Sequence, residues 1–412
     1  MKLSTTITAT GIALAWSISS YSVTISNQIA HPYDCASCEH LSHDALSTHW
    51  PIQANQLGHE TLHQQISKKY SVNTTFKEIE KGVDLYTEAP GAVIRISTVA
   101  SPNKHHATPA FKPTFFIKTK KSGLLQLNQA SRLIATDDEL KHSYFAKDTP
   151  VILQLKPELG AGKITLSASP TPGHEDLQYI VHVFDKNAES YLTVETNKAM
   201  YHYGDQLTTT ITLGDNVSHY PLDSVKASLV NPEGDIIPLT LKQNADNRYS
   251  ATTSLKSTKN SVGDNWYVEA ETVANQQGNL INRQAHTAFT YAIPSAVINE
   301  INQADSSPFT FTATIDVATA SRYALEAVLF RTDEKGNKIP LEVAQSASWL
   351  TPGVQQITFS FAPEDTNTAT GQFYVSAVQL IDYGQIKPVF GYDGFIPVRG
   401  CPESSCLQLA KQ

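Results

Sequence analysis

The chain has 412 residues, which is room for about three domains of ordinary size. Hydrophobic residues make up 41% and charged residues 17% of it, a composition that supports folded cores and excludes a wholly disordered chain. The net charge of −8 lacks the basic balance typical of nucleic-acid-binding proteins, so we expect no nucleic-acid partner.

The first residues have the pattern of a secretion signal. Lys2 supplies a positive charge, Ile7 to Ile18 form an apolar stretch, and small serines suited to cleavage follow it. We therefore predict a signal peptide over residues 1–22, cleaved after Ser19 or Ser22. The apolar stretch is short and interrupted by Thr and Ser, so we expect no membrane span and a mature protein that is secreted or periplasmic.

Residues 23–82 differ in character from everything that follows. A helix suits residues 54–68 better than a strand does, and we expect this N-terminal segment to pack on the first sandwich without a core of its own. The segment is rich in histidine, at His31, His40, His43, His49, His59 and His63.

The remainder of the chain predicts an all-β protein of three tandem antiparallel β-sandwiches, Ig-like or fibronectin-like, after this short, partly helical segment. Apolar and polar residues alternate with period two, which points successive side chains to opposite faces of a strand. Turn residues such as Gly, Pro, Asn and Asp separate the alternating runs. The predicted boundaries are 83–188, 189–293 and 294–400, with a cysteine-containing tail over 401–412.

The central stretch shows the pattern most clearly. About seven short strands in about a hundred residues, with no helical window between them, are what a two-sheet sandwich requires. Its strands are predicted at 191–196, 206–213, 225–230, 236–241, 249–255, 266–273 and 283–291. In the first sandwich, Thr136 and Glu139 have the spacing of a capping box, which predicts a short helix to about Tyr144.

Five segments carry a family resemblance. They are 179–185 (YIVHVFD), 247–251 (NRYSA), 265–270 (NWYVEA), 282–291 (NRQAHTAFTY) and 346–353 (SASWLTPG). With these segments the chain resembles an uncharacterised family of exported Gram-negative bacterial proteins with C-terminal Ig-like domains. The likeness covers most of the chain after about Val83 and implies the fold and export. It supplies no catalytic residues.

Four cysteines suit an oxidising compartment, at Cys35, Cys38, Cys401 and Cys406. Four cysteines permit three pairings, and we favour the two local pairs because each cysteine has a partner within a turn. Cys35 and Cys38 also have the spacing of a redox pair, or of a zinc site completed by nearby histidines. No βαβ pattern follows to support the first, and four ligands within nine positions leave little room for tetrahedral geometry.

One motif points to catalysis. His59, Glu60 and His63 match H-E-x-x-H, in which two histidines one helical turn apart hold Zn²⁺ and the glutamate acts as general base. Its context is poor, because the sequence turns into sandwich strands soon after Gly82 and no third-ligand motif follows.

We therefore predict an exported, non-catalytic, monomeric protein that binds a protein or glycan surface and needs no cofactor. The alternative prediction is a secreted zinc-dependent peptidase with Glu60 as catalytic residue and His59 and His63 as metal ligands, for which zinc would be the cofactor.

Overall fold

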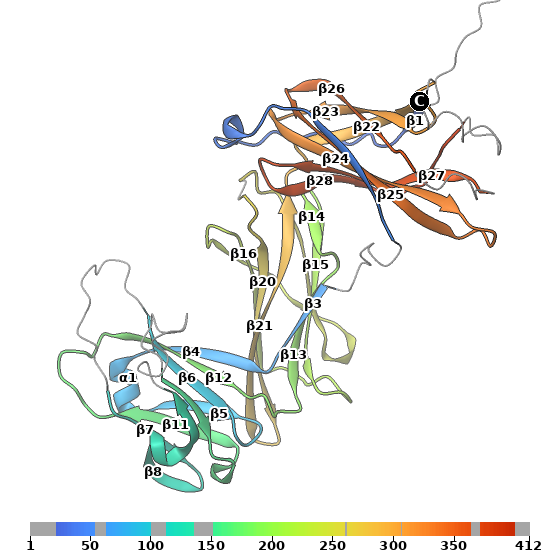
Figure 1. The fold of residues 1–412 in the computed structure, drawn as a ribbon. Helices are drawn as coiled ribbons and strands as arrows, with labels where there is room; N and C mark the ends of the chain where they lie inside the picture. The colour runs from blue at the N-terminus through green and yellow to red at the C-terminus, as the bar shows by residue number, and fades with distance from the viewer. Residues whose placement is uncertain are drawn as a thin grey trace, which may run out of the picture. The chain divides into compact units, whose positions relative to one another are not determined.

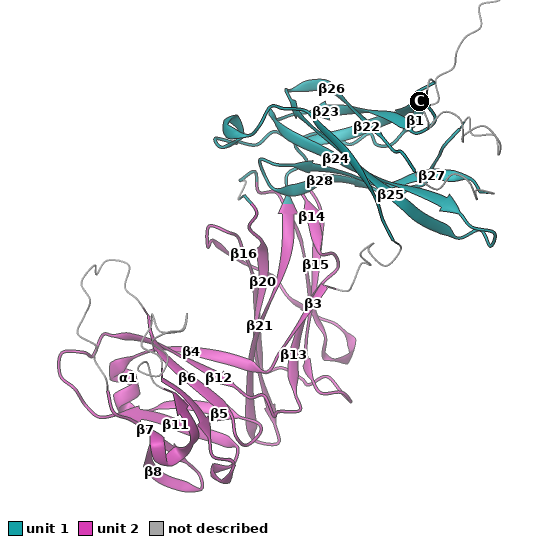
Figure 2. Ribbon diagram, viewed as in Figure 1, with its two compact units in different colours: residues 1–59, 258–262, 292–412 teal, residues 60–257, 263–291 magenta. Residues whose placement is uncertain are grey.

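The protein is all-β and consists of three β-sandwiches (Figure 1). Our computed structural model describes residues 22–53, 63–99, 113–135, 151–259, 262–305, 307–363 and 371–399. The chain divides into two compact units, coloured in Figure 2. One unit comprises residues 60–257 and 263–291, and the other comprises residues 1–59, 258–262 and 292–412.

Alternation in the sequence translates directly into the strands. In β13 (Tyr191–Thr196), Leu192 and Val194 are fully buried while Tyr191, Thr193 and Glu195 are half-buried. Burial of one face at a time is what a strand in a two-layer sandwich requires, because only one face meets the core.

The first sandwich has a five-stranded layer packed on a four-stranded layer. The larger layer has the order β4-β12-β6-β10-β9, and the smaller has the order β5-β11-β7-β8. Its elements are β4 (Lys69–Thr75), α1 (Phe76–Lys81), β5 (Val83–Thr87), β6 (Val93–Thr98), β7 (Phe115–Thr119), β8 (Ser122–Gln126), α2 (Leu127–Ala130), β9 (Ser131–Ala135), β10 (Val151–Leu155), β11 (Gly162–Ala168) and β12 (Gln178–Phe184).

The central sandwich packs the sheet β18-β19-β15-β13-β3 on the sheet β17-β16-β20-β21, with β14 also paired to β21. Trp266, Phe289 and Tyr201 lie in its core as a cluster of rings. Its other strands are β3 (His63–Ser67), β14 (Met200–His202), β15 (Gln206–Gly214), β16 (Ser224–Val230), β17 (Ile236–Pro238), β18 (Lys242–Gln243), β19 (Tyr249–Ser254), β20 (Trp266–Gln276) and β21 (Asn279–Ala292).

The C-terminal sandwich packs the sheet β1-β22-β23-β26 on the sheet β2-β25-β24-β27-β28, with β29 paired to β27. Its elements are β1 (Ser22–Thr24), the 3-10 turn η1 (Cys38–His40), β2 (Leu46–Pro51), β22 (Ala296–Gln303), β23 (Thr310–Val317), β24 (Ser321–Thr332), β25 (Lys338–Leu350), β26 (Gly353–Ser360), β27 (Phe373–Asp382), β28 (Lys387–Tyr392) and β29 (Ile396–Pro397).

The N-terminal segment contributes strands to all three sandwiches, so our expectation that it packs on the first one is wrong for most of its length. Strand β1 pairs with β22 and β2 pairs with β25, both in the C-terminal sandwich. Strand β3 pairs with β13 of the central sandwich, and only β4 joins the first. Local alternation does not say which distant strand a segment will pair with, and this is why the assignment failed.

The helix expected over residues 54–68 is wrong where the structure describes it, because residues 63–67 form strand β3. The helix expected from Thr136 lies outside the described residues. A capping box does occur at α1, where the Thr75 side chain accepts from the Glu78 backbone N–H and the Glu78 carboxylate accepts from the Thr75 N–H. These two bonds satisfy N–H groups that a helix start leaves without partners.

The first and central sandwiches share one ten-stranded sheet. They join between β4 and β21 through a single paired position, Lys69 opposite Gln284. The Gln284 side chain strengthens this join, because its Oε1 accepts from both the backbone N–H and the hydroxyl of Ser71, at 2.9 and 2.8 Å.

Candidate functional site

The join between the first and central sandwiches is built around a buried arginine, Arg283 on β21. Its register places it in line with Ala285, Thr287 and Phe289, all of which face the sandwich interior. The Arg283 side chain is 1% exposed. A guanidinium cannot lose its charge in a protein, so a buried one needs anionic or strong acceptor partners.

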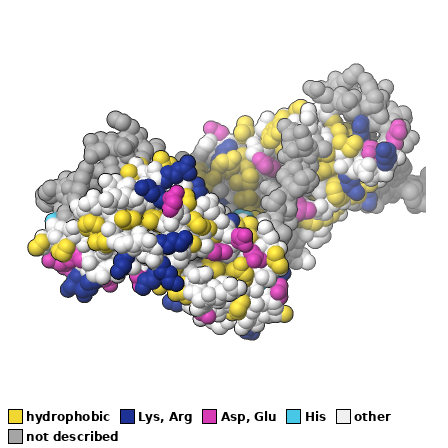
Figure 3. Space-filling view, turned by 90° about the horizontal axis from the view of Figure 1, so that it is seen from below, with side chains coloured by type: hydrophobic (Ala, Val, Ile, Leu, Met, Phe, Trp, Pro, Cys, Tyr) yellow, Lys and Arg dark blue, Asp and Glu magenta, His cyan; other side chains and the backbone are white. Residues whose placement is uncertain are grey.

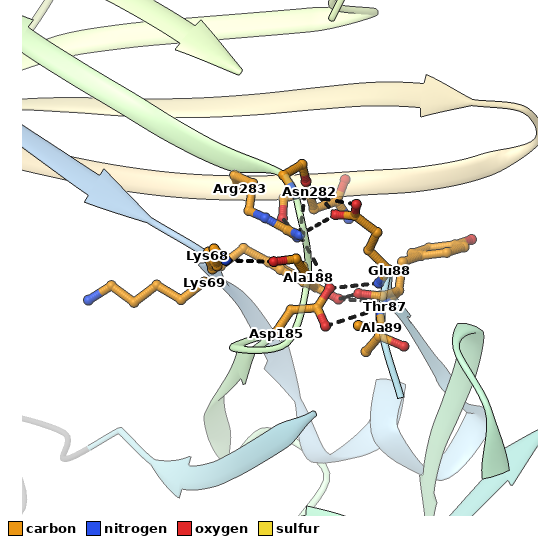
Figure 4. A network of polar contacts seen from close by, with 12 residues as sticks. Lys68, Lys69, Thr87, Glu88, Ala89, Asp185, Ala188, Asn282 and Arg283 are labelled. Carbon is orange, nitrogen blue, oxygen red and sulfur yellow. Dashed lines mark hydrogen bonds and ion pairs between the residues drawn. The ribbon is translucent and has the colours of Figure 1, made fainter. Parts of the chain in front are cut away.

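Those partners come from the β5–β6 loop, from the connection between β12 and β13, and from β21 itself (Figure 4). The Arg283 Nη2 group donates to Glu88 Oε2 at 2.9 Å, to Asp185 Oδ2 at 3.2 Å and to the Ser190 hydroxyl at 3.2 Å. Its Nη1 group donates to the Asn282 carbonyl. The Ser190 hydroxyl in turn donates to Glu88. Residues from both sandwiches therefore meet at one charged group.

Asp185 extends this network into the backbone. Its carboxylate accepts from the N–H groups of Glu88 and Ala89, and its own N–H donates to the Lys68 carbonyl. Burial raises the pKa of Asp185 above its ordinary value, although Arg283 and the two backbone bonds act in the opposite direction. The Lys68 ammonium donates to the Ala188 carbonyl at 2.6 Å, which holds the same connection from the other side.

A groove runs along this fixed join, and we call it the junction groove. Residues of β3, the start of β4, the end of β12 and β21 line it. Its volume is about 420 Å³. The residues that line it are Gln65, Ile66, Ser67, Lys68, Lys69, Phe184, Lys186, Ala285 and His286.

The junction groove is basic. Three lysines and a histidine line it, and its lining contains no carboxylate. Lys69 and Lys186 are exposed, and among the described residues neither ammonium group has a hydrogen-bond or ion-pair partner. The one apolar side chain of β3 in the groove, Ile66, is 49% exposed.

A second, smaller hollow continues the groove along the outer face of the shared sheet. It has a volume of about 290 Å³ and shares Lys69, Ala285 and His286 with the first. Here Glu269 and Glu271 enter the lining. Burial lowers the pKa of His182 in this hollow, and the nearby charges of Arg95 and Lys69 lower it further, so this ring is mainly neutral at pH 7.

Elsewhere the charge is dispersed. The space-filling view in Figure 3 shows several separate groups of Lys and Arg with apolar side chains between them. Of the lysines in the first sandwich that the structure describes, Lys118, Lys120 and Lys121 are exposed on or beside the β7–β8 turn. They border no cavity described here, whereas the junction groove combines charge with a concave surface.

The residues proposed for zinc are only partly described. His63 lies at the start of β3, where its Nε2 contacts the Ala288 carbonyl. His59 and Glu60 lie outside the described residues, so the metal site and the catalytic role stay predictions. The helical spacing on which they rest does not extend to His63, which is on a strand. Among the described residues, no group of three metal-binding side chains lies together.

Cys35 and Cys38 form a disulfide within the N-terminal segment, and Cys401 and Cys406 lie outside the described residues. The disulfide loop packs on the C-terminal sandwich at Gly384, where an added Cβ would overlap the Cys38 sulfur and the Tyr33 hydroxyl. The Tyr33 hydroxyl donates to Asp382, which is fully buried.

Five neutral groups donate hydrogen bonds to the Asp382 carboxylate. Burial, followed by the charge of Asp382, raises the pKa of the Tyr33 hydroxyl, so this group stays a donor. The donors are Tyr33 Oη at 2.9 Å, Ser295 Oγ at 2.5 Å, Ser321 Oγ at 2.6 Å, Gly384 N at 2.8 Å and Gln385 Nε2 at 3.1 Å.

Nearby rings and carbonyls fix residues 42–49 of the segment to the same sandwich. The His43 ring stacks on Trp349 with centroids 4.0 Å apart, and the Arg322 guanidinium donates to the carbonyls of Ser42 and Asp44. Two residues of the histidine-rich segment, His43 and His49, therefore serve packing and pairing, since His49 contacts the buried Glu342.

The alternating pattern of the sequence could have identified Arg283 and Asp382 as buried charged residues. Each is a charged residue at the inward position of an alternating strand, Arg283 in line with Phe289 and Asp382 in line with Leu380. The residues of the junction groove gave no such signal, because they come from four separate strands and connections.

No helix among the described residues is long and apolar enough to cross a membrane.

Comparison with known proteins places the chain in a family. Models of the N-terminal, central and C-terminal domains of a domain of unknown function, DUF4785, match residues 37–185, 188–292 and 295–399. A crystal structure of a DUF4785 family protein from Legionella pneumophila is similar to this chain at 35% identity and a TM-score of 0.78, over 92% of this chain and 100% of that one.

More distant likenesses are weak. The native form of α2-macroglobulin from Escherichia coli is similar at 11% identity and a TM-score of 0.30, over 78% of this chain and 19% of that one. A tandem repeat from a large adhesion protein is similar at 16% identity and a TM-score of 0.20, over 81% of this chain and 74% of that one. Neither bears on function at these values. Curated proteins gave no match. On the three domain matches and the similarity to the Legionella protein, the chain belongs to the DUF4785 family.

Proposed function

We propose that the protein is an exported, non-catalytic binding protein that holds a partner macromolecule in the junction groove. The observation that carries this proposal is the groove itself: a basic cavity of about 420 Å³ on a join that a buried charge network fixes in place. Export is supported by the predicted signal peptide and by the Cys35–Cys38 disulfide, since disulfides persist mainly in oxidising compartments.

The fixed join supports binding because a preformed groove does not have to be ordered by its ligand. The strands that line the groove belong to two sandwiches, and the Arg283 network resists their separation because separation would expose buried charges. Lys69 and Lys186 then present two ammonium groups at defined places. Exposed cations on a concave surface accelerate association with an anionic partner and select against a cationic one.

Site-specific photo-crosslinking in the producing cells tests this proposal. A photoreactive amino acid replaces Gln65 in the groove, and a matched one replaces Lys120 in the exposed turn of the first sandwich. We expect a discrete adduct at position 65 that is absent at position 120 and disappears when Lys69→Glu and Lys186→Glu are introduced. The same adducts at both positions, or none at position 65, would overturn the proposal.

A further inference from the structure

Strand β3 is an edge strand that borders the junction groove. It ends the sheet β18-β19-β15-β13-β3 and, among the described strands, pairs only with β13. Gln65, Ile66 and Ser67 of this strand line the groove. An edge strand presents backbone N–H and C=O groups to which a further strand can pair.

This edge is held firmly. The His63 ring contacts the Ala288 carbonyl at one end of β3, and at the other end the Ser67 hydroxyl accepts from the Lys69 N–H at 3.2 Å. The Lys68 carbonyl, just beyond the strand, accepts from the Asp185 N–H at 2.9 Å. Because both ends are anchored, a pairing segment would meet an ordered template and would lose less binding free energy to ordering.

The side chains around the edge select for acidic residues. Lys69 follows β3 by two residues and Lys186 follows β12, and both line the groove, whose lining contains no carboxylate. In an extended strand, alternate side chains point to the same face. A segment paired to β3 would therefore direct every second side chain toward these ammonium groups, and the others toward Ile66 or solvent.

We propose that the junction groove binds an extended acidic peptide segment of a partner protein by strand addition to β3. The inference rests on the proposed binding function and narrows it to one class of ligand. The five residues of β3 set the length of the paired stretch, which is about 17 Å at the usual rise per residue. A peptide is favoured over an acidic glycan because an edge strand borders the groove, and Phe184, the one Phe, Tyr or Trp in the lining, is half-buried.

Fluorescence anisotropy with labelled peptides tests the inference on the full-length mature protein. The probe is a peptide of about ten residues in which Glu alternates with Thr or Val, long enough to span β3 with spare residues at each end. Two control probes are compared with it: the same peptide with Lys in place of Glu, and an oligogalacturonate of similar length and charge. Two further probes carry N-methyl groups on either the odd or the even residues.

We expect the acidic peptide to bind and the basic peptide to fail. One of the two N-methylated peptides should lose binding, because only alternate N–H groups of a paired strand face its partner. Lys69→Glu with Lys186→Glu should weaken binding by about tenfold or more, whereas Lys120→Glu, an equal charge change per site on the exposed turn, should leave it unchanged. Circular dichroism of each variant confirms that the fold is retained.

Other outcomes overturn the inference in separable ways. Equal binding of both N-methylated peptides would mean that no strand pairing occurs. Binding of the oligogalacturonate in place of the peptide would assign the groove to acidic glycans. Absence of peptide binding, while the cross-link at position 65 persists in cells, would reject the acidic peptide and leave the proposed binding function standing.

Discussion

Each of the two compact units buries a charged residue where distant segments of the chain meet, and the two solve the problem of burial differently. Arg283 is paired with two carboxylates, those of Glu88 and Asp185. Asp382 has no cation among its hydrogen-bond partners in the described residues and is surrounded by hydroxyl, amide and backbone donors.

This difference predicts how each connection responds to substitution of one of its residues. In the Arg283 network, charges of opposite sign offset one another, so the loss of one partner leaves an uncompensated charge in the interior. Around Asp382 every partner is neutral, so the loss of one donor removes a single hydrogen bond and leaves the others in place. The join of the two sandwiches is therefore the more sensitive to single substitutions. The contact of Tyr33 and the Cys35–Cys38 loop with Asp382 and Gly384, which we call the N-terminal clasp, is the more tolerant.

The largest expected effect is at Arg283. We expect Arg283→Ala to lower the free energy of unfolding by about 3–5 kcal/mol, because it leaves Asp185 buried without its cation. Urea unfolding followed by tryptophan fluorescence measures this, and Trp266 in the central core is a suitable reporter.

A neutral version of the same network separates charge from packing. The triple variant Arg283→Met, Glu88→Gln, Asp185→Asn removes all three charges, and we expect it to recover much of the lost stability. A triple variant no more stable than Arg283→Ala would show that packing, and not the buried charge, sets the cost.

The second prediction concerns Asp382. We expect Asp382→Asn to lower the free energy of unfolding of the C-terminal sandwich by about 1–3 kcal/mol, because an amide places N–H groups against donors that need acceptors. Asp393→Asn, the same chemical change at an exposed position, is the matched control and should have little effect. A loss as large as that of Arg283→Ala would mean that the charge of Asp382 matters as much to the clasp as the charge of Arg283 does to the join.

Gly384 gives a steric test of the same clasp. A Cβ at this position overlaps the Cys38 sulfur and the Tyr33 hydroxyl, so we expect Gly384→Ala to displace the disulfide loop at a cost of about 1–3 kcal/mol. The readout is the rate at which dithiothreitol reduces the Cys35–Cys38 bond, which should rise when the loop is displaced.

Gly391→Ala is the control for this variant. Gly391 lies on β28 with no atom within 4 Å of the added Cβ, so its reduction rate should match the wild type. Equal reduction rates for both variants would mean that Gly384 does not hold the loop.

The sequence predicts the sandwich strands well and their partners poorly, for a physical reason that β2 and β3 illustrate. Alternation marks a strand only where one face is buried, as in β13. All six residues of β2 are exposed, and β3 is mostly glutamine and histidine, so neither carries the signal. Pairing to a distant edge is fixed by backbone hydrogen bonds that any residue but proline can make, and these leave no trace in composition.

The residues of the candidate site also differ in how well the sequence predicts them. The H-E-x-x-H motif at His59 to His63 was visible because its spacing is local, and the strand at His63 removes the helical premise at that residue. The junction groove was invisible because Gln65, Lys69, Lys186 and His286 meet only after the two sandwiches join. Arg283 lies between these cases, since its inward register could have marked it as the residue that fixes the join.

The smallest expected effect is the pH dependence of stability that Asp185 contributes. It shows whether burial or the charge of Arg283 has the larger effect on the pKa of Asp185. Its folded pKa is raised, so its contribution to stability is fully present below its unfolded pKa of about 3.9 and is lost as the pH rises through the folded value. The stability of Asp185→Asn relative to the wild type should therefore increase as the pH rises from about 3.9. Urea unfolding of both proteins at several acidic pH values measures the slope. A relative stability that falls over this range would mean that the Arg283 charge outweighs burial, and the two buried networks would then differ less than their partners suggest.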